Sequence, residues 1–158
     1  MDITPHLAFD GTCEEAFTFY AATFGGTLQT LLRYRQTPIA ADVPAGFADK
    51  IIHATLRVGA ATLMGNDVTP GDYVRPQGVA VALGMSDPAA AKRTFDALAA
   101  GGVITLPLAE TFWALAFGAV VDRFGVTWEI NCERPARRRV PVRGRTQTPA
   151  RTGRRRSV

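Results

Sequence analysis

An internal repeat is the feature that most constrains the fold of this chain. The two copies are Glu14–Leu31 and Ala89–Leu108. In each copy a helical pattern of apolar residues ends at a double glycine, and a short apolar strand follows at once. Gly25 and Gly101 open these double glycines and lie 76 residues apart, as do Phe19 and Phe95. Glycine commonly ends a helix because it adopts the left-handed conformation. The chain therefore builds one supersecondary unit twice.

Strand-like segments surround both predicted helices in the same order. One strand precedes each helix, three follow it, and a hairpin closes each half. The strands are expected at Ile3–Phe9, Thr27–Arg35, Lys50–Val58 and Ala61–Asp67, and again at Val79–Met85, Val103–Leu108, Trp113–Asp122 and Thr127–Cys132. The sequence thus predicts an α+β protein of two βαβββ modules, at about residues 1–67 and 78–133, whose sheets together form a cup.

Alternation along the strands predicts which side chains line that cup. In the first strand Ile3, Leu7 and Phe9 suit the side of the helix, which leaves Thr4, His6 and Ala8 on the cup side. A face of small residues precedes the second helix, at Gly78, Ala80, Ala82 and Gly84. In the last strand Glu129 is opposed to Trp128 and Ile130, so the carboxylate is expected to face the cup.

Charge is divided between two unlike segments. Residues 134–158 contain ten arginines and no acid, whereas the other 133 residues hold eight basic and 14 acidic residues, a net of −6. The basic segment has little to bury, so we expect a disordered arginine-rich tail. Such a tail can bind nucleic acid through phosphate, but no aromatic residue interleaves with its arginines.

Several classes of protein are not favoured by the composition. No apolar run approaches the roughly 20 residues that span a membrane, and the first residues lack the pattern of a signal peptide. The two cysteines, Cys13 and Cys132, show no spacing typical of a disulfide framework or a zinc site. We therefore expect a cytoplasmic protein with one domain and a tail.

The repeat and its sequence details resemble a known superfamily. Paired βαβββ modules are the architecture of the vicinal oxygen chelate superfamily, which includes glyoxalase I, extradiol dioxygenases and bleomycin-resistance proteins. The stretches FDGTCEEAFTFY, IIHATLRVG, LMGND, LAAGG and ETFWALAFGAVVDRFGVTWEINC are similar to the PhnB-like branch and cover most of Ile3–Cys132. The resemblance implies a small-molecule pocket and a homodimer. Members of this branch have been labelled demethylubiquinone methyltransferases, but no glycine-rich loop here suits a methyl donor.

The resemblance also raises the question of a divalent metal. Metalloenzymes of the superfamily take ligands from the first and last strands of each module, and a catalytic metal needs about three protein ligands. Glu129 stands at the last-strand ligand position, and His6 lies in the first strand. The strand that opens the second module offers only Val79–Ala82, so the set is incomplete. A metal at His6 and Glu129 is therefore less favoured than a polar pocket role for Glu129.

Other residues have both a ligand-binding and a structural interpretation. His53 could form hydrogen bonds in the cup or simply bond the backbone. Phe112 and Trp113 could stack on a planar ligand or form core or dimer contacts. Met64 and Ala80 are expected to line or fill the pocket. The candidate ligand-binding residues are His6, His53, Met64, Ala80, Phe112, Trp113 and Glu129.

Three functions remain open at the level of sequence. The first is a small-molecule pocket protein of the glyoxalase and bleomycin-resistance type, whose specific reaction the sequence does not assign. The second is a binding or sequestering protein without catalysis, which the incomplete ligand set favours. The third is a nucleic-acid-associated protein that acts through its basic tail.

Overall fold

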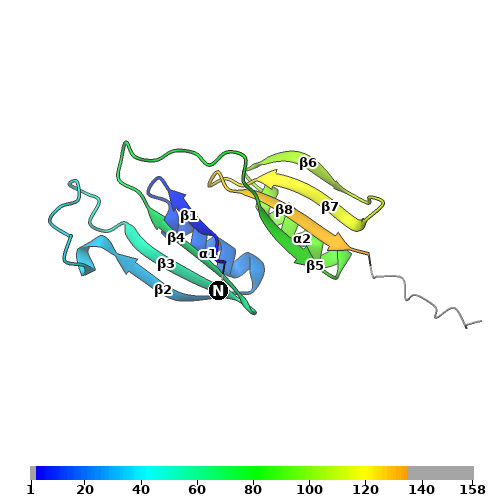
Figure 1. Ribbon diagram of the computed structural model, residues 1–158, viewed down its shortest axis with the longest axis horizontal. Helices are drawn as coiled ribbons and strands as arrows, with labels where there is room; N and C mark the ends of the chain where they lie inside the picture. Colours follow the sequence, from blue (N-terminus) through cyan, green and yellow to red (C-terminus); the bar gives the residue numbers. More distant parts are fainter. Residues whose placement is uncertain (1–2, 135–158) are drawn as a thin grey trace, which may run out of the picture.

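The computed structural model describes residues 3–134, so the tail from residue 135 lies outside the described residues. The first module contains β1 (His6–Phe9), α1 (Cys13–Phe24), β2 (Thr27–Arg33), a short 3-10 helix (Tyr34–Gln36), β3 (Ile51–Val58) and β4 (Ala61–Asp67). The second contains β5 (Val81–Met85), α2 (Pro88–Ala99), β6 (Val103–Ala109), β7 (Ala114–Val121) and β8 (Thr127–Glu133). The predicted α+β class and the two βαβββ modules are confirmed (Figure 1).

Each module forms its own four-stranded mixed sheet. The strand orders are β1-β4-β3-β2 and β5-β8-β7-β6. β1 runs parallel to β4, β5 runs parallel to β8, and the remaining pairs are antiparallel. Within this part of the chain β1 and β5 each pair on one side only, so each leaves a free edge. Among the described residues, no helix is long and apolar enough to cross a membrane.

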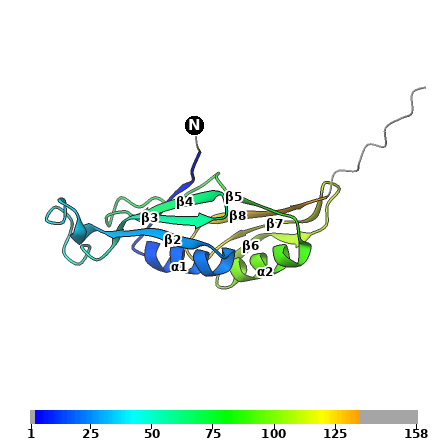
Figure 2. The ribbon, with the colours of Figure 1, turned by 90° about the horizontal axis from the view of Figure 1, so that it is seen from below.

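Both helices lie on the same side of the two sheets. Figure 2 shows the strands in one layer, with α1 and α2 side by side beneath it. The two sheets therefore lie next to each other and do not enclose a space between them. Each sheet leaves one face uncovered by a helix, and the two uncovered faces point in the same direction.

The double glycines act in two ways. The first glycine of each pair has a positive φ, 66° at Gly25 and 77° at Gly101, which ends the helix. The second lets the chain pass close to a strand: a Cβ at Gly26 would lie 2.7 Å from the carbonyl oxygen of Arg57, and one at Gly102 would lie 2.3 Å from that of Val121. Each double glycine therefore ends a helix and then lets the chain pass close to a neighbouring strand.

Buried aromatic rings pack each helix on its sheet through a glycine. The ring of Phe17 lies over Gly65 of β4, and that of Phe95 lies over Gly118 of β7. Phe19, which the repeat aligns with Phe95, is only partly buried, and Phe17 takes the fully buried position. The glycines of the two copies are 76 residues apart, whereas the two buried rings, Phe17 and Phe95, do not have this spacing.

The first strand of each module begins later than the alternation predicts. β1 begins at His6, and Ile3 is 93% exposed, so its expected place on the side of the helix is wrong. Pro5 lacks an N–H, and only its carbonyl joins the sheet, by accepting a hydrogen bond from the N–H of Met64 at 3.0 Å. In the second module β5 begins at Val81 rather than Val79.

A buried carboxylate joins the two modules. Asp122, 3% exposed, accepts hydrogen bonds from the Tyr20 hydroxyl at 2.6 Å and from the Trp128 indole N–H at 2.8 Å. Its other oxygen accepts from the backbone N–H groups of Phe124 and Val126. Because Tyr20 belongs to α1, this carboxylate fixes the first helix against the second sheet.

Candidate functional site

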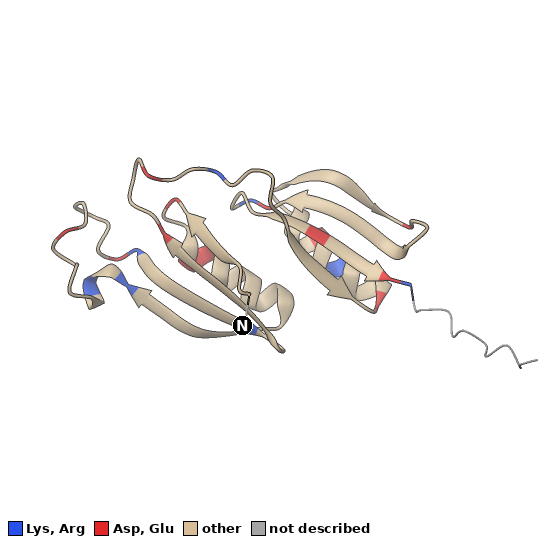
Figure 3. Cartoon of the chain, viewed as in Figure 1, with Lys and Arg blue, Asp and Glu red and all other residues tan. Residues whose placement is uncertain are grey.

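Four of the predicted site residues lie on the two sheet faces that no helix covers, namely His6, His53, Met64 and Glu129. We define the first outer face by His6, Ala8, His53, Thr55, Met64 and Asn66, and the second outer face by Ala82, Gly84, Phe117, Ala119, Glu129 and Asn131. The alternate residues of the same strands are buried against α1 and α2. Charged residues are sparse along these strands and gather in loops, helices and strand ends (Figure 3).

The first outer face brings three predicted residues together. His6 is directly opposite Met64 on the neighbouring strand, and Met64 is opposite Thr55. The rings of His6 and His53 stack, with centroids 6.4 Å apart and planes 27° from parallel. Nε2 of His53 lies 3.0 Å from Oγ1 of Thr55, which orients the ring. The sequence indicated this face for His6, but the pairing of the two imidazoles was not foreseen.

The electrostatics of this pair favour neutral imidazole. Burial, and then the neighbouring His53, lower the pKa of His6 below its ordinary value of 6.5. A positive charge on His6 would lose part of its hydration. His6 is therefore neutral at physiological pH and can accept a hydrogen bond or bind a metal.

On the second outer face the neighbours of Glu129 have small side chains. Glu129 pairs with Ala82 on one side and with Ala119 on the other, so the carboxylate stands above methyl groups. The predicted orientation of Glu129, opposite to the buried Trp128, agrees with this register. Ala80 precedes β5 and is half-buried.

Asn131 is a polar residue of this face that was not among the predicted ligand-binding residues. It lies between Gly84 and Phe117, and a Cβ at Gly84 would meet nothing within 4 Å. Within residues 3–134 its Oδ1 is the buried side-chain oxygen without a hydrogen-bond partner. A buried acceptor without a partner needs a hydrogen-bond donor, which a ligand could supply. The available signal was that Asn131 stands two residues from Glu129 in the same strand.

The aromatic residues form a ridge at the end of β7. The rings of Phe112 and Trp113 lie 4.5 Å apart, and Trp113 lies 5.5 Å from Phe117 of the second outer face. Phe112 is 90% exposed and Trp113 is 44% exposed, so Phe112 is no core residue. Phe117 links the ridge to the sheet and was missed because its strand reads as a continuous apolar run.

The two predicted metal ligands stand on different faces. His6 is on the first outer face and Glu129 is on the second, and the two sheets lie in one layer. In the described part of the chain no three His, Cys, Asp or Glu side chains are grouped so that they could hold a metal ion. Any site that uses both residues needs the two faces to be brought opposite each other.

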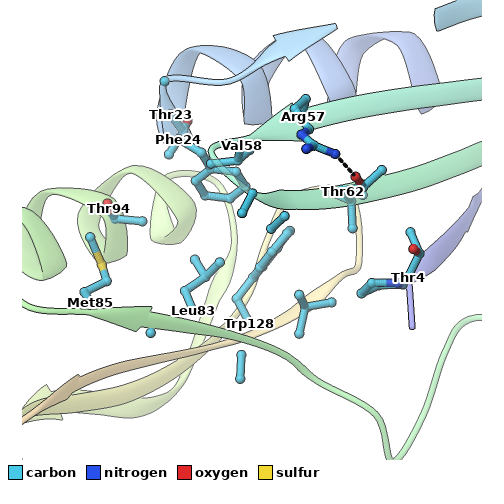
Figure 4. Close-up of a pocket in the computed structure, with 18 of the residues that line it drawn as sticks. Thr4, Thr23, Phe24, Arg57, Val58, Thr62, Leu83, Met85, Thr94 and Trp128 are labelled. Atoms are coloured by element: carbon cyan, nitrogen blue, oxygen red, sulfur yellow. Dashed lines mark hydrogen bonds between the residues drawn. The ribbon is translucent and has the colours of Figure 1, made fainter. Parts of the chain in front are cut away.

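An open cleft of about 1350 Å³ separates the modules. Figure 4 shows Phe24 and Trp128 at its base, Arg57 and Thr62 on the β3–β4 hairpin, and Leu83 on β5. Arg57 donates a hydrogen bond to Oγ1 of Thr62 at 3.2 Å. Of the predicted site residues only Met64 lines this cleft, together with Ala82 and Gly84 of the second outer face, so the cleft adjoins both outer faces.

Comparisons with known proteins agree on one relationship. Residues 1–131 match the family described as 3-demethylubiquinone-9 3-methyltransferase. Protein YjdN of Escherichia coli is 36% identical over 139 residues, which cover 83% of this chain and 95% of that protein. The crystal structure of protein PA1353 from Pseudomonas aeruginosa is 44% identical, with a TM-score of 0.76, and covers 84% of this chain and 98% of that one.

Two further structures place the fold. A Bacillus cereus structure described as a putative 3-demethylubiquinone-9 3-methyltransferase, PhnB protein, is 25% identical, with a TM-score of 0.71 over 83% of this chain and 98% of that one. A glyoxylase/bleomycin resistance protein/dioxygenase domain from Frankia shares the fold at 12% identity, with a TM-score of 0.57 over 85% of this chain and 98% of that one. The chain belongs to the family described as 3-demethylubiquinone-9 3-methyltransferase, the PhnB-like branch of the vicinal oxygen chelate superfamily.

Proposed function

We propose that this protein binds a small molecule as a homodimer, with the first outer face of one copy opposite the second outer face of the other. The observation that carries this proposal is that both faces are uncovered in one chain although both carry polar and aromatic side chains. A sheet face that holds a histidine pair, or a carboxylate with an unpaired amide oxygen, gains most when a second surface excludes water.

The free edges of β1 and β5 support such a pairing. Each strand pairs on one side only, and an unpaired edge exposes backbone N–H and C=O groups. Exposed apolar residues stand just before both edges, with Ile3 93% and Val79 70% exposed. Covering them in a symmetric dimer would remove apolar surface from water twice over.

Each face would supply a different part of the binding site. His6, His53 and Met64 of one copy offer two imidazoles and a thioether, while Glu129 of the other offers a carboxylate. Ala80 keeps the floor shallow, and Phe112 and Trp113 form an aromatic wall at the rim. Such a cup suits a ligand with a planar apolar body and groups that donate hydrogen bonds to Glu129 and Asn131.

The proposal is for binding, without an assigned reaction. Methyl transfer, the activity in the name of the family, is not proposed, because the strand-to-helix turns at Asp10–Thr12 and Ser86–Asp87 are not glycine-rich phosphate loops. A cytoplasmic location accords with two free, buried cysteines. Binding of nucleic acid by the arginine-rich segment rests on residues outside the described part of the chain.

A mixture of two variants tests the shared site. A thermal-shift screen first identifies a ligand, since a ligand at a hundred times its dissociation constant adds about 2.7 kcal/mol of stability. His53→Gln and Glu129→Gln are then prepared separately, and each is expected to bind the ligand weakly. After subunit exchange, a mixed dimer has one cup with both substitutions and one intact cup, so about a quarter of all sites should regain full affinity.

The control is the double variant that carries both substitutions in one chain. Mixed with the wild-type protein, it should also give mixed dimers, but every cup in these dimers contains one substituted face. If the two single variants regain no sites after exchange while the double variant exchanges normally, the site belongs to one chain and the proposed dimer is wrong. If the protein is a monomer at micromolar concentration, the proposal fails at its first step.

A further inference from the structure

We propose that His6, His53 and Met64 form a copper(I) site on the first outer face, with all three ligands supplied by one chain. This inference goes beyond the proposed function, because it requires neither a second copy nor a small-molecule ligand. It also differs from the metal site that the resemblance implied, because Glu129 is not part of it and His53 belongs to β3.

The spacing of the two imidazoles carries the proposal. Their centroids are 6.4 Å apart, with planes 27° from parallel. A ring nitrogen lies about 1.1 Å from its centroid and a metal–imidazole bond is about 2.0 Å, so two rings on opposite sides of one ion have centroids roughly 6 Å apart. The observed separation is slightly longer than this, so binding one ion requires the two side chains to rotate until a nitrogen of each ring points at it.

Met64 stands where a third ligand is needed. It lies between the two histidines in the sheet, since β4 separates β1 from β3 and Met64 is directly opposite His6. The side chain is half-buried and shares their face. A thioether is a soft ligand, and two imidazoles with one thioether favour Cu(I) over the hard cations that prefer oxygen.

The neighbouring groups prepare the histidines to act as ligands. Oγ1 of Thr55 lies 3.0 Å from Nε2 of His53, which leaves Nδ1 of that ring for a metal. The same hydrogen bond fixes the orientation of the ring, as residues that hydrogen-bond to metal ligands commonly do. Asn66 extends the same face beside His53 and adds an oxygen donor without charge.

The experiment is a competition for Cu(I) between the full chain and bicinchoninate under anaerobic conditions. We expect the protein to remove one Cu(I) per chain from the chelator. Removing a residue that only hydrogen-bonds to a metal ligand weakens metal binding about 10- to 100-fold. Removing a ligand itself should weaken binding at least as much, so we expect His53→Gln and Met64→Leu each to weaken it at least tenfold. Met85→Leu, a matched change at the methionine of β5, should leave the affinity unchanged.

X-ray absorption gives a second readout, which does not depend on affinity. The wild-type protein should show a sulfur atom bound to copper, and Met64→Leu should lose it while Met85→Leu keeps it. Light scattering on the same samples shows whether the assembly state has changed, so failure of the copper site is separated from failure of the proposed dimer. Three outcomes overturn the proposal: copper remains with the chelator, copper follows Cys13 or Cys132, or all variants bind equally, which indicates an adventitious ion only.

Discussion

The two modules share one frame but present different outer faces. Both modules have the same strand order, the same helix position and a glycine that brings the chain within van der Waals contact of a strand. Their outer faces differ in the side chains at their centres: the first presents His6, His53 and Met64, and the second presents Glu129 above Ala82 and Ala119.

This difference separates what folds the chain from what the chain does. Features present in both modules are explained by packing alone, since two copies of one unit bury their helices in the same way. The side chains of the uncovered faces differ between the modules and do not pack the helices, whereas the buried residues Asp67 and Asp122, each found in one module only, support the fold. The two modules are therefore equivalent as structure, and we propose that they are complementary as a binding site.

The largest effect is expected where the modules meet, because this contact has no counterpart inside a module. Asp122→Ala should lower the free energy of unfolding by about 3–4 kcal/mol, because Tyr20 and Trp128 would keep buried donors without an acceptor. Urea denaturation measures the change, and Tyr20→Phe should cost less, since it removes one of the paired groups. A cost below 1 kcal/mol for Asp122→Ala would mean that the modules do not depend on this carboxylate.

The shared frame is tested by the second glycine of each pair. Gly26→Ala and Gly102→Ala should each lower the free energy of unfolding by about 2–3 kcal/mol, because the new Cβ would overlap a strand carbonyl oxygen. Gly84→Ala is the matched control on an outer face, where a Cβ meets open space, and it should be neutral or slightly stabilising. If all three substitutions lower the free energy of unfolding by similar amounts, the second glycines are no more important to the fold than a glycine on an outer face.

A smaller, pH-dependent effect is expected at Asp67 in the first module. Burial raises the pKa of Asp67 above 3.8, although its carboxylate accepts hydrogen bonds from the N–H groups of Ile51 and Cys13. The folded state then binds more protons than the unfolded state, so the stability that protonated Asp67 provides is complete below pH 3.8 and is lost as pH rises through the raised pKa. Asp67→Asn should remove this slope.

The measurement for Asp67 is the difference in unfolding free energy between the two proteins across that pH interval. The wild-type protein should lose stability relative to Asp67→Asn as the pH rises. Asp87→Asn is the control, because the side chain of Asp87 is exposed at the start of α2. A wild-type stability that rises with pH relative to Asp67→Asn would reverse the sign and show that hydrogen bonding outweighs burial at Asp67.

The smallest effect on stability is expected on the second outer face. Glu129→Gln keeps the shape of the side chain and should change the free energy of unfolding by less than about 0.5 kcal/mol. Ligand binding should respond much more, since a hydrogen bond to a charged group contributes about 1.5–3 kcal/mol, or more than tenfold in affinity. Unchanged affinity for the ligand found by the screen would exclude Glu129 from the pocket.

Local signals explain how much of the fold the sequence predicts. Asp87 followed by Pro88 is a local signal for the start of α2, and the side chain of Asp87 accepts hydrogen bonds from the N–H groups of Ala89 and Ala90. The double glycines and the alternation around Glu129 are local in the same sense. Each depends on residues that are near one another in the chain, so a pattern can express it.

Long-range contacts explain what the sequence does not predict. The side chain of Thr12 does not cap α1, and Asp67, 54 residues away from Cys13, accepts a hydrogen bond from its N–H instead. Tyr20 and Asp122 are 102 residues apart, and no spacing rule connects them. The same holds for the site: alternation placed His6 and Glu129 on outer faces, but only the packing of the helices decides that both faces open in one direction.

The central claim, that the two outer faces meet between copies, can be measured with a spin label. Thr30 is exposed on β2 opposite Thr55, so Thr30→Cys carries the label at the rim of the first outer face. The native thiols should not react, since both cysteines are buried, and burial, then Asp67 and Glu14, raise the pKa of Cys13. The labelled chain is mixed with an unlabelled, ¹⁵N-enriched chain, and only contacts between copies broaden the amide signals.

Broadening of the amide signals of Glu129, Asn131 and Phe117 is the predicted result. A label at Lys92→Cys on the exposed side of α2 should leave these signals sharp. If the Thr30→Cys label broadens no signal of the second outer face in mixed dimers, while light scattering shows an assembly larger than the chain mass of 17.0 kDa, the copies meet elsewhere and the account of the site is wrong.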